Sequence, residues 1–251
     1  MKTIILCGGY GSRLKEETEF KPKPMIEIGG KPIVWHIMKI YCHHNFNKFI
    51  LALGYKGNII KDYFLQSHYM VNDFRLNASS AEILTDVDDN FDIIFSDTGL
   101  NSLTGERILK LKKYITEDNF MVTYGDGVAD VDISALVKFH KEQNTMGTIT
   151  GVHPHSKYGL VKIDNANKLV MAFEQKPLLH DYVSGGFMVF KKEAMKYFDE
   201  GIMENGLMKM AEDKQLSIYC HDGFWQAMDT YYEMEELNKM WAENPKWKIW
   251  S

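Results

Sequence analysis

Short apolar runs alternate with amphipathic stretches along the first 152 residues. The runs are rich in β-branched and aromatic residues and predict strands, whereas apolar residues that recur every three or four positions predict helices. This alternation is typical of a mostly parallel sheet with helices on both faces, an α/β fold. The predicted strands are 3–7, 49–53, 91–96, 120–124 and 147–152, and the predicted helices are 32–43, 58–66, 106–115 and 133–143.

The pattern changes after residue 152. Three short strands follow one another closely, which predicts a small antiparallel β extension instead of another strand–helix–strand unit. No internal repeat, low-complexity tract or long linker divides the chain, so we predict one domain over 1–251, with a core over about 1–152 and a second portion over about 153–251. The second portion has predicted strands at 160–163, 169–174, 183–190, 216–219 and 224–227, and predicted helices at 192–198, 207–214 and 231–242.

Composition and charge narrow the classes of partner. The chain has 251 residues, 45% of them hydrophobic, and 29 Lys and Arg against 34 Asp and Glu give a net charge of −5. A basic surface for nucleic acid is therefore not expected, and small molecules are the favoured partners. Three widely spaced cysteines indicate reduced thiols and a cytoplasmic protein. The apolar run before Gly8 is too short for a signal peptide or a membrane span, so no membrane partner is expected.

A glycine-rich turn, Gly8-Gly9-Tyr10-Gly11-Ser12-Arg13, directly follows the first predicted strand. Free backbone N–H groups at the carboxyl end of such a strand are typical of a phosphate-binding loop. The turn lacks the Gly-Lys-Ser/Thr of a P-loop, and Leu14 stands where a dinucleotide fingerprint has its third glycine. A turn that needs its glycines only for chain geometry is the alternative.

Cations near this turn favour a polyphosphate ligand. Arg13 follows the glycines, and Lys21-Pro22-Lys23-Pro24 carries two lysines on a segment that prolines stiffen. Lys23 has a proline on each side and is therefore expected to be held in place more firmly than Lys21. A solvated surface segment is the alternative for both lysines.

Two aspartates end apolar runs that lie far apart in the chain. Asp126 follows the strand 120–124 between two glycines, and Asp229 follows the run at 224–228. Two carboxylates in one cleft beside a phosphate loop are the oxygen ligands that Mg²⁺ prefers. The alternative for Asp229 is the N-cap of the helix that follows it.

Taken together, these motifs resemble the sugar-phosphate nucleotidyltransferases, specifically their glucose-1-phosphate cytidylyltransferase branch. The resemblance covers essentially the whole chain, and it is carried by the segments 8–14, 21–25, 125–130 and 224–230 and by the Trp-Lys-Ile-Trp end. It implies a Rossmann-like core with an antiparallel β extension. It also implies transfer of CMP from CTP to a phosphorylated acceptor, with Mg²⁺ as the cofactor and release of pyrophosphate.

The resemblance assigns roles residue by residue. CTP phosphates would lie on the backbone of Gly8, Gly9, Gly11 and Ser12, and Gly105 and Arg107 would contact the cytosine. Arg13 and Lys23 would be the catalytic cations, and Asp126 and Asp229 would bind the metal. Lys176 would bind the acceptor phosphate, with Gln175, Ser184 and Tyr158 as further acceptor-binding residues. The core would thus bind the nucleotide, and the second portion would bind the acceptor.

The acceptor side departs from the family pattern of Glu-Lys-Pro, Asn-Gly-Gly and Glu-x-Glu-Pro-Leu. Gln175 precedes Lys176, Ser184 precedes Gly185-Gly186, and Met203-Glu204-Asn205-Gly206-Leu207 replaces the acidic proline-containing segment. Polar groups at such positions decide specificity, since leaving them unpaired is costly. The sequence also resembles CTP:phosphoglutamine cytidylyltransferases of bacterial capsule synthesis, so we predict L-glutamine phosphate as acceptor and CDP-L-glutamine as product. Glucose-1-phosphate, giving CDP-glucose, is the alternative.

Two function classes outside the family remain as alternatives. A catalytically silent nucleotide-binding regulator would lack a metal carboxylate or the phosphate cations, and this chain has both. An NAD-dependent dehydrogenase needs an acidic residue after the second strand, where Lys56 stands instead. His153 and His155 lie near the expected acceptor pocket without an assigned role. The resemblance further implies a homo-oligomer, for which Trp241, Trp247 and Trp250 form a candidate interface.

Overall fold

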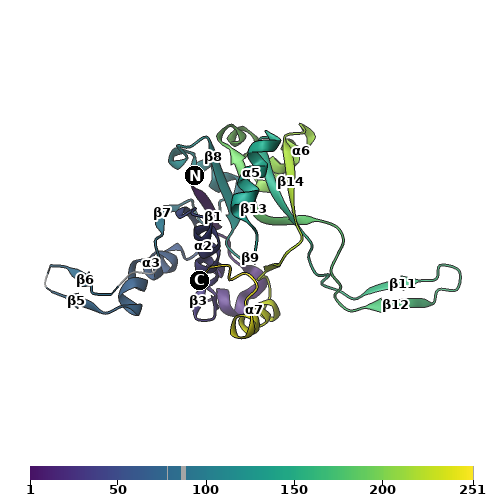
Figure 1. Cartoon of the computed structure of the whole chain (residues 1–251), viewed down its shortest axis with the longest axis horizontal. Helices are drawn as coiled ribbons and strands as arrows, with labels where there is room; N and C mark the ends of the chain where they lie inside the picture. The colour runs from purple at the N-terminus through teal and green to yellow at the C-terminus, as the bar shows by residue number, and fades with distance from the viewer. Residues whose placement is uncertain (78, 86–88, 251) are drawn as a thin grey trace.

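The computed structural model describes residues 1–77, 79–85 and 89–250. Within these residues the main sheet has seven strands, and all of them run parallel except β13. The mostly parallel mixed sheet predicted from the sequence is confirmed (Figure 1). In spatial order the strands are β14 (Leu216–His221), β10 (Gly147–Val152), β13 (Val183–Lys191), β8 (Asn119–Tyr124), β1 (Thr3–Cys7), β4 (Lys48–Leu53) and β7 (Asp92–Asp97).

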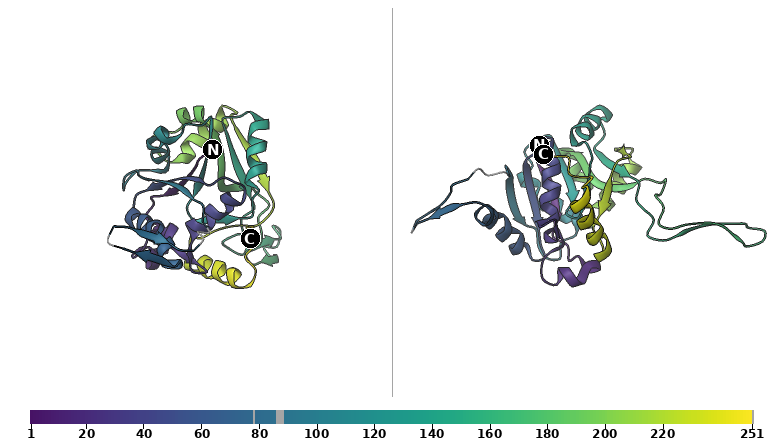
Figure 2. Two further views of the ribbon diagram at one scale, coloured as in Figure 1. Left: turned by 60° about the vertical axis from the view of Figure 1, so that its left-hand side comes forward. Right: turned by 60° about the horizontal axis from the view of Figure 1, so that its bottom comes forward.

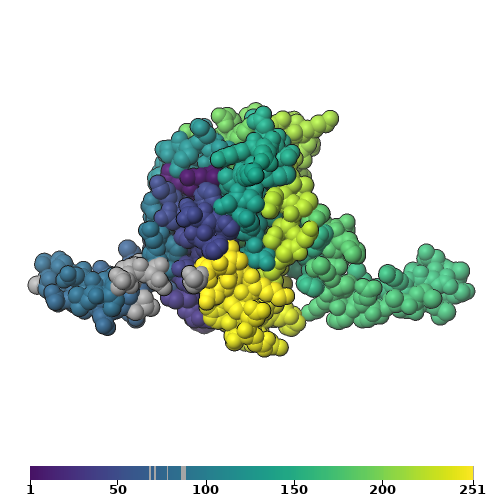
Figure 3. Space-filling model, viewed as in Figure 1, coloured from purple at the N-terminus to yellow at the C-terminus, as the bar shows by residue number. Residues whose placement is uncertain are grey.

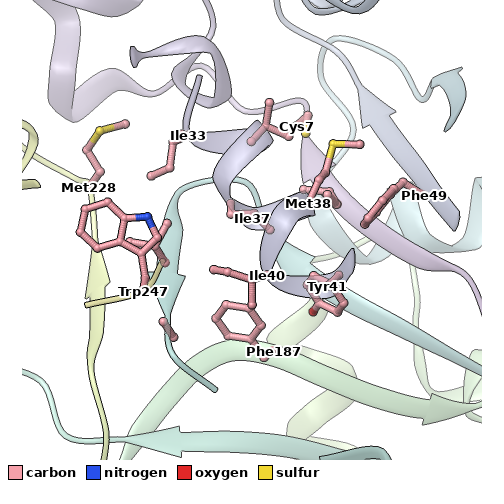
Figure 4. Packing of buried hydrophobic residues seen from close by; sticks show 14 of the residues in the cluster. Cys7, Ile33, Ile37, Met38, Ile40, Tyr41, Phe49, Phe187, Met228 and Trp247 are labelled. Carbon is pink, nitrogen blue, oxygen red and sulfur yellow. The ribbon is translucent and has the colours of Figure 1, made fainter. Parts of the chain in front are cut away.

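Helices cover both faces of the sheet, because successive residues of a buried strand point to opposite sides. Ile5 and Cys7 of β1 pack in one apolar cluster, and Ile4 and Leu6 pack in the other. Figure 4 shows the first cluster around Ile37, with side chains from both the sheet and the helices. That cluster includes α2 (Ile33–His43), α3 (Gly57–Val71), α5 (Ile133–Gln143) and α7 (Tyr231–Glu243), whereas α4 (Thr104–Lys110), the 3₁₀ helix η4 (Lys192–Tyr197) and α6 (Met203–Glu212) pack in the second.

Strand β13 lies in the middle of the main sheet, between β8 and β10. The prediction that 183–190 belongs to a separate antiparallel extension is therefore wrong, although the strand is antiparallel to both neighbours. Its residues from Gly185 to Phe190 are all buried, which is typical of a central strand. The central sheet consequently joins the predicted core to the second portion of the chain.

In the described residues, four small antiparallel pairs surround the main sheet. Two of them extend away from the body on opposite sides, as Figures 1 and 3 show. These projecting pairs are β5 (Phe74–Leu76) with β6 (Ala81–Ile83), and β11 (Leu160–Ile163) with β12 (Val170–Glu174). The other two pairs are β2 (Glu27–Ile28) with β3 (Lys31–Pro32), and β9 (Gly127–Ala129) with β15 (Trp225–Ala227).

Short helical turns complete the described chain. The predicted helix 106–115 is split, since α4 ends at Lys110 and a 3₁₀ turn follows, and the predicted helix 192–198 is 3₁₀. The remaining turns are η1 (Ser12–Leu14), α1 (Lys15–Thr18), η2 (Lys23–Met25) and η3 (Lys112–Tyr114). Within the described ranges, no helix has both the length and the apolar character needed to cross a membrane.

The C-terminal tryptophans pack on their own domain. Trp247 is fully buried and Trp250 is 9% exposed, and both lie beside His36 of α2. The ring of Trp241 lies 4.7 Å from that of His36. The prediction of an interface at these tryptophans is therefore corrected, since they pack on α2 and close the core, with the last residues lying beside the body of the protein (Figure 2).

Candidate functional site

The candidate site lies at the carboxyl ends of β1 and β8. These strands are parallel neighbours, and β1 also pairs with β4 on its other side. The chain order therefore reverses at β1, the position where open α/β sheets bind ligands. A cavity of about 530 Å³ opens there, lined by residues 6–13, 23–24, 100–104, 107, 124–126, 202 and 229.

The glycine-rich turn forms one wall of this cavity. Gly11 has a φ of 64°, and a β-carbon there would lie 2.7 Å from a methyl carbon of Thr18. At Gly8 a β-carbon would overlap the guanidinium of Arg107. Nothing lies within 4 Å of the corresponding position at Gly9, and Ser12 is exposed. Chain geometry thus requires glycine at 8 and 11, while the backbone at 9 faces open space beside the cavity.

Lys23 lies between the two predicted metal-binding aspartates. Its ammonium donates to Oδ2 of Asp126 at 2.7 Å and to Oδ1 of Asp229 at 2.6 Å. The flanking Pro22 and Pro24 are buried and hold the 3₁₀ turn that carries Lys23. Burial opposes the charged amine, but Asp126 and Asp229 outweigh it and raise the pKa of Lys23. The structure thus brings together three residues that lie up to 206 positions apart.

Three cations surround Asp229. Besides Lys23, Arg13 Nη1 lies 3.2 Å and Lys157 Nζ 3.7 Å from its Oδ2. Burial would raise the pKa of this carboxyl, but Lys23, Arg13 and Lys157 lower it. Lys21 instead pairs with Glu27 at 3.4 Å and is not among the residues that line the cavity. Sequence reasoning missed Lys157, because its partner Asp229 lies far away along the chain.

The helix after Asp229 is capped by a different residue. Thr230 accepts from the N–H of Glu233, and Glu233 accepts from the N–H of Thr230, which is a capping box. The alternative of Asp229 as the N-cap of α7 is therefore wrong. Both of its carboxylate oxygens are directed to cations of the site.

Arg107 lines the cavity but is only 3% exposed. Its terminal nitrogens donate to the carbonyls of Gly8, Leu53, Gly99 and Leu100 and to the hydroxyl of Thr98. These bonds tie the glycine-rich turn to the loop after β7. The guanidinium that is predicted to contact cytosine is thus already hydrogen-bonded to protein oxygens. Its contact with cytosine stays a prediction.

Gly105 does not line the cavity. Its N–H donates to the carbonyl of Gly201 at 2.9 Å, and a β-carbon there would lie 2.7 Å from that oxygen. Gly105 therefore allows α4 to pack against the loop before α6. This placement gives Gly105 a packing role, and its predicted contact with CTP stays a prediction.

The predicted acceptor-binding residues lie outside the cavity lining. Lys176 places its ammonium 4.2 Å from the ring centroid of Tyr232, and its backbone has a φ of 48°. Gln175 and Ser184 are exposed, and Tyr158 is 78% exposed. Tyr158 precedes β11, Gln175 and Lys176 follow β12, and Ser184 is the second residue of β13.

Hydrogen bonds connect the segment 153–158 to Lys176 and its neighbours. His155 Nδ1 lies 3.1 Å from the carbonyl of Lys176, and the N–H of Ser156 donates to the carbonyl of Pro177. His153 instead pairs with Asp222 at 3.4 Å. His155 thus helps to position the lysine, and the same segment carries Lys157 to Asp229.

Two further side chains line the cavity that the sequence analysis did not name as site residues, Tyr124 and Cys7. Tyr124 donates to a carboxylate oxygen of Glu204 on α6, and burial together with Glu204 raises the pKa of Tyr124. Cys7 also lines the cavity, where burial and Asp126 raise the pKa of its thiol. This thiol is therefore protonated, which disfavours Cys7 as a nucleophile.

Comparison with protein families matches residues 2–243 to the nucleotidyl transferase family. The chain belongs to the nucleotidyl transferase family. It is 40% identical to a "Probable glucose-1-phosphate cytidylyltransferase" of Bacillus subtilis and 38% identical to a glucose-1-phosphate cytidylyltransferase of Salmonella typhi, with both chains covered completely in each case. A crystal structure of UDP-glucose pyrophosphorylase with UDP-glucose has a similar fold, with a TM-score of 0.69 at 14% identity over 96% of this chain and 98% of that one.

The carboxylates of this nucleotidyl transferase would suit a magnesium ion whose coordination shell is completed by phosphates of the substrate. Asp126 and Asp229 bind the same ammonium, so their oxygens are close enough to share one ion. Among the described residues, no group of three or more His, Cys, Asp or Glu is placed to hold a metal. Two carboxylates with nucleotide phosphates and water are the usual oxygen donors for Mg²⁺.

Proposed function

We propose that this nucleotidyl transferase transfers CMP from CTP to glucose-1-phosphate, giving CDP-glucose and pyrophosphate. The observation that carries the proposal is Lys23, held between Asp126 and Asp229 beside a glycine-rich turn in one cavity. The choice of nucleotide and acceptor is supported by two full-length relatives that are named for this reaction.

In this reaction a phosphate oxygen of the acceptor attacks the α-phosphorus of CTP. A new P–O bond forms, the bond to the oxygen that bridges the α and β phosphorus atoms breaks, and pyrophosphate leaves with that oxygen. No protein nucleophile is needed, so the protein contributes positioning and neutralisation of charge.

The chain's own residues have distinct roles in the proposal. The N–H groups at 8–12 bind the triphosphate, and Lys23 neutralises charge at the α-phosphate. Arg13, 72% exposed at the mouth of the site, neutralises the departing pyrophosphate. Lys157 and Lys176 bind the acceptor phosphate. Magnesium, bound by Asp126 and Asp229 with the phosphates, would supply Lewis-acid stabilisation of the same charge.

Glucose-1-phosphate is favoured over L-glutamine phosphate as acceptor. The argument for the glutamine compound rests on the departures at Gln175, Ser184 and Asn205, whereas two full-length relatives, 40% and 38% identical, are named for glucose-1-phosphate. The replaced acidic segment still supplies a carboxylate, since Glu204 binds Tyr124 of the cavity lining. A carboxylate is a suitable acceptor for sugar hydroxyls. Use of the product in capsule or other surface polysaccharide synthesis remains a prediction from the resemblance.

The test is pyrophosphate release by the purified chain with Mg²⁺. CTP is compared with UTP and dTTP, and glucose-1-phosphate is compared with L-glutamine phosphate made in situ. We expect turnover with CTP and glucose-1-phosphate that is lost in Asp126→Asn, a variant that keeps the shape of the side chain. Turnover with L-glutamine phosphate alone would show that this compound, and not glucose-1-phosphate, is the acceptor. A preference for UTP or dTTP would contradict the proposed nucleotide.

A further inference from the structure

Two lysines of the proposed acceptor side reach the start of α7. Lys157 Nζ lies 3.7 Å from Oδ2 of Asp229, which lines the cavity and directly precedes the N-cap of this helix. Lys176 Nζ lies 4.2 Å from the ring centroid of Tyr232, only three positions after Asp229. The ring of Tyr232 therefore directs Lys176 to the same end of α7 that presents Asp229 to the cavity.

The backbone of Lys176 is held by the segment that carries Lys157. Its carbonyl lies 3.1 Å from Nδ1 of His155, and the carbonyl of the following Pro177 accepts from the N–H of Ser156. The rest of Lys176 is a stem of four methylene groups, which loses rotamer freedom when its ammonium is fixed by a ligand. A contact that already holds the ammonium lowers the cost of this ordering on binding.

An aromatic ring can hold an ammonium without neutralising it. The face of the ring attracts a cation but places no negative charge beside it, unlike the carboxylate that lies beside Lys157. The hydroxyl of Tyr232 is hydrogen-bonded to Glu236, which raises the pKa of Tyr232, so the phenol stays neutral. The charge of Lys176 thus remains available to a phosphate group.

We propose that Tyr232 is a positioning residue of the transfer reaction, which holds the ammonium of Lys176 ready for the phosphate group of the acceptor. This inference rests on the proposed function, in which Lys176 binds that phosphate. The ring of Tyr232 is the part that acts, and its hydroxyl is not required.

The test is steady-state pyrophosphate release by the full chain, with CTP and glucose-1-phosphate varied in turn. Tyr232→Leu removes the ring and should raise KM for glucose-1-phosphate about 3- to 5-fold, with kcat and KM for CTP within about 2-fold of the wild type. Tyr232→Phe keeps the ring and should have wild-type constants. Tyr231→Leu is the matched control, because Tyr231 is the neighbouring residue of α7 and is similarly exposed, at 50% against 55% for Tyr232.

A double-mutant cycle shows whether Tyr232 acts through Lys176. In a Lys176→Met chain the ring has no ammonium to hold, so adding Tyr232→Leu should not raise KM for glucose-1-phosphate any further. A further rise of the same size as in the wild type would contradict the proposal. Far-UV circular dichroism checks that each variant is folded, and Tyr232→Gln takes the place of Tyr232→Leu if the latter does not fold.

Other results would also overturn the proposal. These are a wild-type KM in Tyr232→Leu, an equal rise in Tyr232→Phe, or a lower KM in Tyr232→Leu, which would mean that the ring keeps Lys176 away from the acceptor. Failure of the proposed acceptor gives a different result, a wild-type chain that turns over L-glutamine phosphate instead of glucose-1-phosphate. The same constants measured with that compound then test Tyr232, since both acceptors carry a phosphate group.

Discussion

At the scale of single residues, the site depends on one ammonium shared by two carboxylates. Lys23 is 13% exposed, and its two partners are each less than a third exposed, so water screens their attraction only partly. The lysine holds the two carboxylates close together, and with Arg13 and Lys157 it lowers the pKa of Asp229. The same ammonium lies beside the turn that is proposed to hold the triphosphate.

Replacing Lys23 with methionine should lower kcat/KM by about 100- to 1000-fold, the usual effect of removing one preorganised charge from a site of this kind. Lys21→Met is the matched control, because Lys21 belongs to the same segment but pairs with Glu27. Steady-state pyrophosphate release measures both variants. Equal losses in the two variants would mean that Lys23 acts only through the charge of the segment.

Arg107 should act as a positioning residue. Arg107→Met removes the donor for several buried carbonyls and should reduce the free energy of unfolding by about 2–4 kcal/mol, with a raised KM for CTP. Lys110→Met, one turn further along α4 and more exposed, should cost less than about 1 kcal/mol. Urea unfolding and KM measurements with CTP and UTP check this. A folded Arg107→Met chain of wild-type stability that no longer distinguishes CTP from UTP would instead support the predicted contact with cytosine.

The residues of the cavity could be predicted in part. Gly8, Lys23, Asp126 and Asp229 follow or flank recognisable strands, so their gathering at one sheet edge follows from the order of parallel strands. The environment of Arg107 could not be predicted, since its partners come from the turn after β1, from β4 and from the loop after β7.

At the scale of elements, apolar periodicity located the strands and helices of the main sheet to within a few residues. It did not place β13, because the pattern shows that a strand is buried but not which strands are its neighbours. The β5–β6 pair was also missed, since three-residue strands with charged partners have almost no periodic pattern. Pairing between distant segments is a property of the folded chain.

The contact of α2 with the C-terminal segment should be sensitive to pH. His36 accepts from the indole of Trp247 and is hydrogen-bonded to the carbonyl of Ile28, and burial lowers the pKa of His36 to about 4. Between pH 6.5 and 4 the unfolded chain therefore binds a proton that the folded chain does not, so stability falls as the pH falls. The loss should approach about 3 kcal/mol near pH 4.

Urea unfolding followed by tryptophan fluorescence at several pH values measures this loss. His36→Gln keeps a donor and an acceptor but does not titrate, so the fall between pH 6.5 and 4 should be smaller in that variant. His43→Gln, at the exposed end of the same helix, is the control. An identical fall in His36→Gln and the wild type would contradict the assignment.

At the scale of the whole molecule, the β11–β12 arm, residues 160–174, is joined to the body at the proposed acceptor side. The segments at its base carry Lys176 and Lys157, and hydrogen bonds from His155 and Ser156 hold those segments together. The backbone of the glycine-rich turn and Arg107 are held by the main sheet and its helices, whereas Arg13 shares Asp229 with Lys157 at the base of the arm. Loosening the base of the arm should therefore affect the acceptor side more than the nucleotide side.

If this connection holds, a His155→Ala chain should bind glucose-1-phosphate less well while binding CTP normally. We expect its KM for glucose-1-phosphate to rise about 3- to 10-fold, because the hydrogen bond to the carbonyl of Lys176 is lost and the segments at the base of the arm must be ordered at the expense of binding free energy. Its KM for CTP should stay within about 2-fold of the wild type, since the residues proposed to bind the triphosphate are held by β1 and α4. Initial rates with each substrate varied in turn give both constants, and Lys162→Ser, further along the arm, should match the wild type. Unchanged constants would show that His155 does not order the acceptor side, and an equal rise in both would show that His155→Ala disturbs the whole site.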